Sequence, residues 1–215
     1  MPRSKRNKIV SLTKTQAKGR EQKSKYVESI RSALDEFEHV YVFSYENMRA
    51  GAFKDVRMDW RDSRIFLGKN SISRIALGRS PEDEYKDNLR HVSERIDGNV
   101  GLLFTNRDKK ETLDYFHGYV KAEFGKAGTV PNEDIILSPG PLQFPIAMID
   151  QLRKLGLVVE ADNGVLVLRE RYVAAKNGVP LTPEQAKVLA HLDKPVDEFK
   201  LQVLCAWHDG EFEEL

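Results

Sequence analysis

The apolar residues in the first half of the chain follow two spacings, one typical of helices and one typical of strands. Apolar positions three or four residues apart predict amphipathic helices over Tyr26–Phe37 and Phe53–Trp60. Short β-branched or aromatic runs predict buried strands at Val40–Phe43, Ile65–Leu67 and Leu102–Thr105. Because helices and strands alternate along the sequence, we predict an α/β fold in which layers of helices cover a sheet.

Two further helices are predicted from start signals. The turn Gly68–Ser71 precedes an apolar stripe, and Asn70 or Ser71 is the expected N-cap. The segment Ser80–Asp83 offers a hydroxyl cap, a proline in the first helical position and acidic residues in the first turn, so we predict a helix from Ser80 through Ile96.

The composition changes after about Lys110, where glycine and proline become frequent. The Asn163–Gly164 pair between two apolar runs predicts a β-hairpin. Helix and strand patterns return at Thr182, with an alternating strand pattern over Phe199–Cys205. We therefore predict that residues 21–110 and 182–215 share one layered α/β sandwich, and that residues 111–181 form a smaller inserted domain of β-rich α+β type.

Charge is distributed unevenly between the start of the chain and the rest. Residues 1–25 contain nine basic residues and one acidic residue, whereas the whole chain has a net charge of +1. Residues 1–20 have no apolar periodicity and are expected to be disordered. We expect this basic arm, with Arg3, Lys5, Arg6 and Lys8, to serve RNA contact or nuclear import. The alternative is a solvated charge run without a function.

A second basic region surrounds the 68–71 turn and is predicted to hold the phosphates of folded RNA. Basic helix positions, the turn and the next helix start supply guanidinium, ammonium, amide and hydroxyl donors. The candidate RNA-binding residues are Arg49, Lys54, Arg57, Arg61, Lys69, Asn70, Ser71 and Arg74. The competing interpretation is an ordinary solvated face with ion pairs between helical neighbours.

Sequence signatures of catalysis and of metal binding are absent. The five histidines are scattered and Cys205 is the single cysteine, so no metal site and no cofactor is predicted. Neither a Walker loop nor a serine nucleophile elbow occurs, and the chain is not expected to be an enzyme. The Gly98–Gly101 segment matches a nucleic-acid clamp of KH modules, but a tight turn into a strand explains it better. No apolar run reaches the roughly 20 residues of a membrane span, so no membrane partner is expected.

Three segments of the sequence resemble the ribosomal stalk-base protein family of the large subunit. Gly68–Arg74 is similar to the family's Gly-Lys-Asn-Thr segment, with Ser71 in the hydroxyl position. Gly98–Thr105 resembles the next family block, and the middle region resembles the family's inserted domain. The start of the chain, over residues 1–15, is similar to the nuclear assembly factors of this family. The resemblance implies that Lys69, Asn70, Ser71 and Arg74 contact ribosomal RNA.

The resemblance implies a non-catalytic ribosome assembly factor. Such a factor would bind large-subunit ribosomal RNA at the stalk base on pre-60S particles, beside ribosomal proteins or other assembly factors, and hold the place of the stalk protein until exchange. The expected location is the nucleus and nucleolus, with shuttling to the cytoplasm on the particle. The chain stops at Leu215, without the Ala-rich hinge and acidic tail of the stalk protein, so acidic stalk dimers are not expected partners. A truncated stalk-base protein of mature ribosomes and an RNA-processing enzyme are the alternatives.

Overall fold

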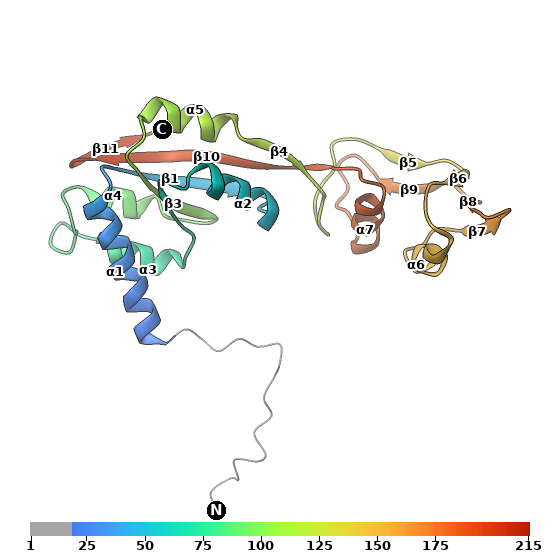
Figure 1. Ribbon diagram of the computed structural model, residues 1–215, viewed down its shortest axis with the longest axis horizontal. Helices are drawn as coiled ribbons and strands as arrows, with labels where there is room; N and C mark the ends of the chain where they lie inside the picture. Colours follow the sequence, from blue (N-terminus) through green and yellow to red (C-terminus); the bar gives the residue numbers. More distant parts are fainter. Residues whose placement is uncertain (1–18) are drawn as a thin grey trace, which may run out of the picture.

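A computed structural model describes residues 19–215 (Figure 1). The predicted basic arm with Arg3, Lys5, Arg6 and Lys8 lies outside these residues. Two units follow one another along the long axis of the molecule, a larger one that contains α1 and the C-terminus and a smaller one built from the middle of the chain (Figure 1). The described helices are α1 (Arg20–Glu36), α2 (Ala50–Asp59), α3 (Asn70–Leu77), α4 (Leu89–Glu94), α5 (Lys109–Gly118), the 3-10 turn η2 (Ile146–Met148), α6 (Ile149–Lys154) and α7 (Pro183–His191).

The larger unit is built on one antiparallel sheet. Its strands follow the order β11-β10-β1-β3-β2, and β4 pairs with the outer part of β10. The bounds are β1 (His39–Glu46), β2 (Arg64–Phe66), β3 (Val100–Thr105), β4 (Val120–Glu123), β10 (Asp197–His208) and β11 (Glu211–Glu214). All three strands predicted in the first half of the chain are therefore present, and they pair with one another as β2-β3-β1.

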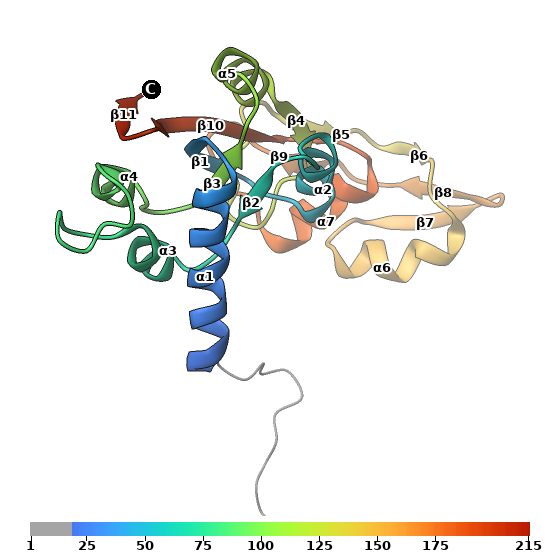
Figure 2. The same cartoon turned by 60° about the vertical axis from the view of Figure 1, so that its left-hand side comes forward.

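Alternation along the strands fills two apolar layers, one on each face of the sheet. Val40 and Val42 of β1 pack in the layer beneath α1, α3 and α4, whereas Tyr41 and Phe43 pack in the layer beneath α2 and α5. Figure 2 shows these helices on the two sides of the sheet. Buried side chains on both faces explain why these strands read as continuous apolar runs. The predicted layered α/β fold is confirmed.

One strand departs from the predicted alternation. The pairing of β1 with β10 shifts by one residue between Val42 and Phe43, so that Val42 faces Cys205 and Phe43 faces Val203. This bulge turns Cys205 toward the α1 layer, while Val203 stays in the α2 layer. Burial raises the pKa of the Cys205 thiol to about 12, which keeps the thiol protonated at neutral pH.

The smaller unit has two short antiparallel sheets around a separate aliphatic core. One sheet pairs β5 (Ile135–Leu137) with β9 (Tyr172–Ala175), and the other has the order β6 (Gly140–Leu142), β8 (Val165–Leu168) and β7 (Val159–Asp162). Asn163 and Gly164 both adopt positive φ, as a tight two-residue turn requires, and the predicted hairpin is confirmed.

The two hydrophobic cores place the boundaries between the units at positions that differ from the predicted ones, 110 and 182. Phe116 of α5 is buried in the core of the larger unit, and β4 extends the same sheet as far as Glu123. Val188 and Leu189 of α7 are buried in the core of the smaller unit. Thr182 begins α7 with a capping box, as its Thr-Pro signal indicated. A return of helical periodicity was therefore no guide to which core the helix joins.

The prediction of a helix that begins at Ser80 is wrong, because residues 80–88 form turns and bends and only Leu89–Glu94 is helical. Asn88 adopts a left-handed conformation immediately before α4, which prevents a continuous helix. The Tyr85 amide donates instead to the Leu77 carbonyl and folds the loop back on α3. The predicted side-chain cap of α3 is also wrong, since Lys69 is the N-cap residue and no side chain caps the helix.

Candidate nucleic-acid interface

The candidate interface is organised by the contact between α1 and the turn that precedes α3. Tyr26 of α1 meets Phe66 edge-on, with ring centroids 5.8 Å apart, and its hydroxyl lies 3.4 Å from the Ser73 Oγ. A side chain on Gly68 would overlap the Tyr26 ring, so glycine permits this close approach. Partial burial raises the pKa of Tyr26, which leaves the phenol neutral. The contact holds the basic N-terminal half of α1 beside Lys69.

Two grooves flank α1 at this point. The first, here called the Lys69 groove, has a volume of 520 Å³ and is lined by Gln22, Lys23, Lys25, Tyr26, Ser29, Leu67, Gly68, Lys69 and Ile72. The second, the Arg61 groove, has a volume of 550 Å³ and is lined by Ser29, Arg57, Trp60, Arg61, Ser63, Arg64, Ile65 and Phe66. Because Ser29 lines both, the grooves meet along the surface of α1.

The two grooves share an electrostatic character. Three basic residues line each groove, and neither lining contains an Asp or a Glu. Carboxylates lie nearby at the edges, where Glu21 pairs with Lys25 at 2.7 Å and Glu36 pairs with Arg64 at 3.3 Å. These exposed pairs contribute little to stability, and they offset part of the charge of Lys25 and Arg64.

An aromatic ring supports one of the guanidinium groups of the Arg61 groove. Arg57 lies over the Phe53 ring at 5.0 Å, and the buried Trp60 forms part of the groove wall. Arg107 covers the other part of Trp60 at 4.3 Å. Its guanidinium donates to Asp62 at 2.8 Å, which holds the pKa of that carboxyl below its usual range, so Arg107 is committed to the fold.

The predicted RNA-binding residues do not form one surface. Arg57, Arg61 and Lys69 line the two grooves, while Lys54 is exposed on α2 outside them. Arg49 donates to the Phe124 carbonyl at 2.5 Å and so belongs to the junction between the units.

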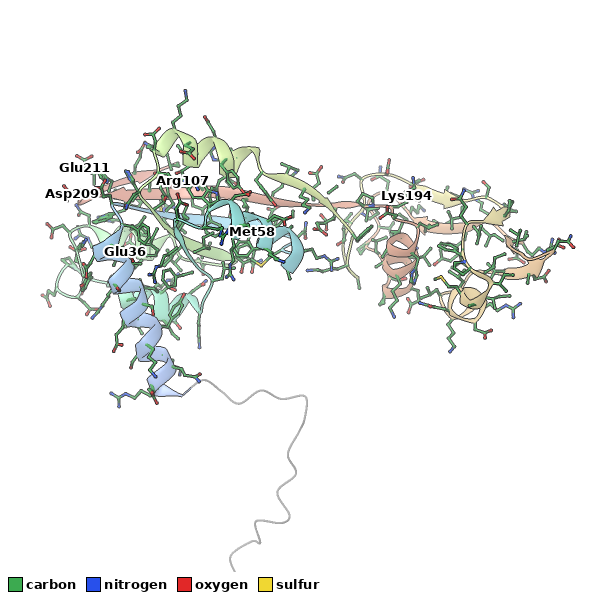
Figure 3. All side chains as sticks on the ribbon, viewed as in Figure 1. Glu36, Met58, Arg107, Lys194, Asp209 and Glu211 are labelled. Atoms are coloured by element: carbon green, nitrogen blue, oxygen red, sulfur yellow. The ribbon has the colours of Figure 1, made fainter. Side chains whose placement is uncertain are left out.

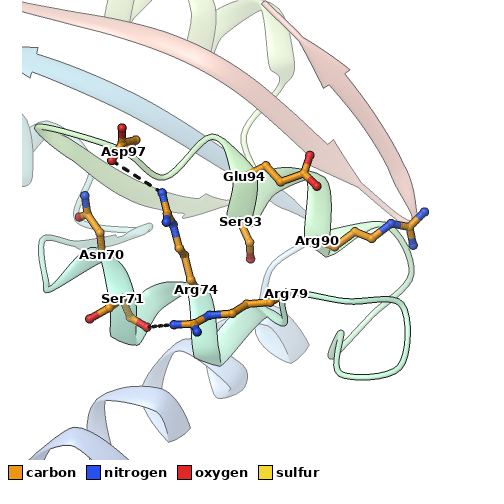
Figure 4. Close-up of a pocket in the computed structure, with 8 residues that line it drawn as sticks. All are labelled: Asn70, Ser71, Arg74, Arg79, Arg90, Ser93, Glu94 and Asp97. Carbon is orange, nitrogen blue, oxygen red and sulfur yellow. Dashed lines mark hydrogen bonds and ion pairs between the residues drawn. The ribbon is translucent and has the colours of Figure 1, made fainter.

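Asn70, Ser71 and Arg74 line a third pocket between α3 and α4 (Figure 4). α1 packs on one side of α3 and α4 on the other, so α3 separates this pocket from the Lys69 groove. The Gly98–Gly101 segment is a turn into β3, and the Gly98 carbonyl accepts a hydrogen bond from Asn70 at 2.9 Å.

Sequence reasoning missed the contribution of α1 to the site. Lys23 and Lys25 line the Lys69 groove, and Arg64 at the start of β2 lines the Arg61 groove. A signal was present, because Gln22, Lys25 and Ser29 recur at helical spacing and share a face of α1. That these positions meet the 68–71 turn follows from the fold alone.

Other kinds of site find no support in the described part of the chain. Residues 19–215 contain no group of three or more His, Cys, Asp or Glu side chains arranged to hold a metal ion. None of the helices within the same residues has the length and apolar character that a membrane span requires.

The chain belongs to the ribosomal protein L10 family. The model of ribosomal protein L10 matches residues 18–121, and the model of the insertion domain found in the 60S ribosomal protein of this family matches residues 125–193. The two matched ranges correspond to the larger and the smaller unit of the structure, each with its own hydrophobic core. The resemblance carried by Gly68–Arg74 and Gly98–Thr105 is thereby confirmed.

Its relatives in the family include proteins named ribosome assembly factor mrt4. The Dictyostelium discoideum protein is 37% identical over 99% of this chain and 96% of its own length, and the Saccharomyces cerevisiae protein is 32% identical over 98% and 95%. The large ribosomal subunit protein uL10 of Methanopyrus kandleri is 25% identical over 88% of this chain and 54% of its own length. These names describe ribosome assembly and ribosome structure and no enzymatic activity, in agreement with the prediction for this chain.

Proposed function

We propose that this protein is a non-catalytic ribosome assembly factor that binds large-subunit ribosomal RNA at the stalk base on pre-60S particles. In this function it holds the place of the stalk protein until exchange. It acts in the nucleus and nucleolus and shuttles to the cytoplasm on the particle. The observation that carries the proposal is the pair of joined grooves, with six basic residues and no carboxylate in their linings.

The geometry suits folded RNA for two reasons. Lysine and arginine side chains at the groove walls neutralise backbone phosphates, and guanidinium planes can stack on unpaired bases. The Arg57 guanidinium already lies over the Phe53 ring, so less side-chain freedom is lost when it binds. A rigid surface of this kind recognises the shape of an RNA fold without bond-breaking chemistry.

The comparisons support a function in ribosome assembly more than a structural function in the mature ribosome. Six relatives named ribosome assembly factor mrt4 are 31–37% identical to this chain, whereas the uL10 proteins of Methanopyrus kandleri and Oxybasis rubra are 25% and 24% identical. The competing function is that of a stalk-base structural protein in mature ribosomes.

Salt-dependent binding to a stalk-base RNA fragment tests the RNA surface. Replacing Arg57, Arg61 and Lys69 together by alanine should weaken binding and reduce the log–log salt slope by about 0.7 to 0.9 for each lost phosphate contact. The control replaces Lys154, Arg171 and Lys176, which are exposed in the smaller unit. Unchanged affinity and slope in the first variant would show that RNA binds elsewhere.

The location of the protein in the cell distinguishes the assembly factor from the structural protein of mature ribosomes. A tagged full-length chain should be found with nuclear pre-60S particles and be absent from polysomes if it is an assembly factor. Recovery mainly from polysomes would favour the stalk-base structural protein. Crosslinking on purified precursor particles should join the chain to stalk-base RNA through the grooves, and crosslinks to other RNA would contradict the proposed placement.

A further inference from the structure

The pocket between α3 and α4 has features of a ligand-binding site, and the two grooves lack these features. Its volume is 640 Å³ and its lining consists of Asn70, Ser71, Arg74, Arg79, Arg90, Ser93, Glu94 and Asp97. We call it the Ser93 pocket. Figure 4 shows its residues contributed from α3 and the loop after it on one side, and from α4 and the following loop on the other.

The Ser93 hydroxyl is a buried donor without an acceptor. Its side chain is 3% exposed, and its Oγ has no hydrogen-bond partner among the described residues. In Figure 4 the hydroxyl points from α4 into the space beside Arg74 and Arg79. Buried hydroxyl groups in folded proteins are almost always paired, so an orphaned one that faces a pocket indicates an absent acceptor.

Two arginines are held in place around the same space. Arg74 donates through Nε and Nη2 to the Ile96 carbonyl, at 2.9 and 2.5 Å, and Arg79 donates through Nη2 to the Ser71 carbonyl at 3.2 Å. A guanidinium has five N–H donors, so each keeps several for a ligand. Arg79 is paired with no carboxylate in the described part of the chain, and its charge is not neutralised locally.

The carboxylates of the pocket lie at its rim. The Asp97 side chain is 92% exposed and 3.7 Å from Arg74, and the Glu94 side chain is 68% exposed and 3.5 Å from His91. Arg90 pairs with Glu84 at 3.1 Å and points away from the centre of the pocket (Figure 4). Ser93 and Arg79 therefore have no carboxylate partner among the described residues, while the Arg74 guanidinium is turned toward Asp97 at the rim (Figure 4).

We propose that the Ser93 pocket binds a phosphate group. A phosphate offers only acceptor oxygens, which match the Ser93 hydroxyl and the two guanidinium groups. The first turn of α3, which no side chain caps, adds the favourable dipole of a helix start at one end of the pocket. The site does not depend on the proposed function, because either free phosphate or a phosphate of a polynucleotide supplies the same chemistry.

Titration with inorganic phosphate tests the site in the full-length protein. At constant ionic strength, phosphate should shift the amide signals of Ser71, Arg79 and Ser93 in a nitrogen-proton correlation spectrum, with chloride as the reference anion. Arg79→Gln should weaken phosphate binding about tenfold, as expected for loss of a charge-assisted hydrogen bond. Arg171→Gln, an exposed arginine of the smaller unit, is the matched control and should bind as the wild type.

Ser93→Ala separates ligand binding from folding. Removal of an unpaired buried hydroxyl should leave the Tm of the phosphate-free protein unchanged or higher, while the rise of Tm with phosphate should shrink. If phosphate moves no signal at the pocket, or if both variants respond like the wild type, the proposal is wrong.

A stalk-base RNA fragment identifies the source of the phosphate. Displacement of bound inorganic phosphate by RNA would assign the pocket to an RNA phosphate, and simultaneous binding would assign it to a free phosphate compound. If RNA binding through the two grooves fails while inorganic phosphate still binds, the proposed function falls and the pocket stands.

Discussion

The two units of the molecule differ in how they use their apolar residues. The larger unit buries aromatic side chains, including Tyr41, Phe43 and Trp60, on the two faces of one sheet. The smaller unit buries leucine, valine and alanine in a single core. It also exposes seven of the twelve large apolar residues that the described chain leaves accessible. The larger unit is therefore a platform with aromatic side chains packed in its core, and the smaller unit carries more than half of the exposed large apolar residues.

The difference extends to charge. The basic grooves and the Ser93 pocket all belong to the larger unit. Glu36, Asp209 and Glu211 are exposed acidic residues of the same unit, and the exposed Lys194 lies on the smaller unit (Figure 3). The comparison teaches that the two basic grooves and the proposed phosphate pocket all lie on the unit whose sheet is covered by helices on both faces.

Core truncation should give the largest effect and test whether the units unfold separately. Trp60→Ala should lower the free energy of unfolding by about 3–5 kcal/mol, because Trp60 is buried against Tyr115 and Phe116. Leu166→Ala should lower it by about 2–5 kcal/mol in the smaller unit. Calorimetry of both variants should show each change in a different transition, and a shared shift would mean that the units unfold as one.

Substitution of Gly68 should give the next largest effect, a loss of RNA affinity, and it tests the contact between α1 and the turn before α3. Gly68→Ala introduces a Cβ into the space of the Tyr26 ring and should displace α1 from the Lys69 groove. RNA affinity should fall about tenfold with the overall fold retained. Gly51→Ala is the matched control, since nothing lies within 4 Å of its added Cβ and alanine favours the helix by about 1 kcal/mol. Equal affinities for the two variants would show that the Tyr26 contact does not shape the RNA surface.

A smaller effect is expected at the junction, which tests whether the two units have a fixed relative orientation. The Asp197 carboxylate accepts hydrogen bonds from Asn47 at 2.5 Å and from Thr129 at 3.1 Å. It therefore connects the residue after β1 to the segment between β4 and β5. Asp197→Ala should destabilise the protein by about 1–3 kcal/mol and broaden the distance distribution between spin labels on α1 and α6. An unchanged distribution would mean that β4 and β10 alone fix the orientation.

The smallest effect is expected from pH and should be confined to the larger unit. His39 stacks on His208 with ring centroids 4.3 Å apart, and burial, followed by the charge of His208, lowers the pKa of His39. The unfolded chain then binds the proton more readily, so stability should fall as pH drops below about 6.5 and level off below the lowered folded pKa. His39→Gln should flatten this dependence of Tm by a few degrees or less, and His117→Gln, at an exposed site, should not.

Much of the fold could be predicted from local pattern. Buried strands at Val40–Phe43 and Leu102–Thr105 gave continuous apolar runs, and the Asn163–Gly164 turn carried its own conformational requirement. The failures have physical causes. The Ser80 start signal was overridden by a left-handed Asn88, and the alternation over Phe199–Cys205 was interrupted by a bulge that depends on the partner strand.

The candidate site could be predicted only in part, because it is made by tertiary contacts. Lys69 and Arg61 were found from their local basic surroundings. Lys23 and Lys25 were missed because the Tyr26–Gly68 contact, which joins α1 to the turn, links positions far apart in the sequence. The separation of Arg74 from Lys69 by α3 likewise follows from the packing of α1 and α4, not from sequence spacing.

The chain leaves and re-enters the main sheet at adjacent points, because Glu123 at the end of β4 is paired with Asp197 at the start of β10. Antiparallel partners lie about 5 Å apart at their Cα atoms, a gap that a two-residue turn can close. The smaller unit is thus inserted through a single hairpin-like opening. Replacing residues 124–196 by Asn-Gly would give a shortened chain with an uninterrupted sheet, and the same opening would accept a different module without a change in strand order.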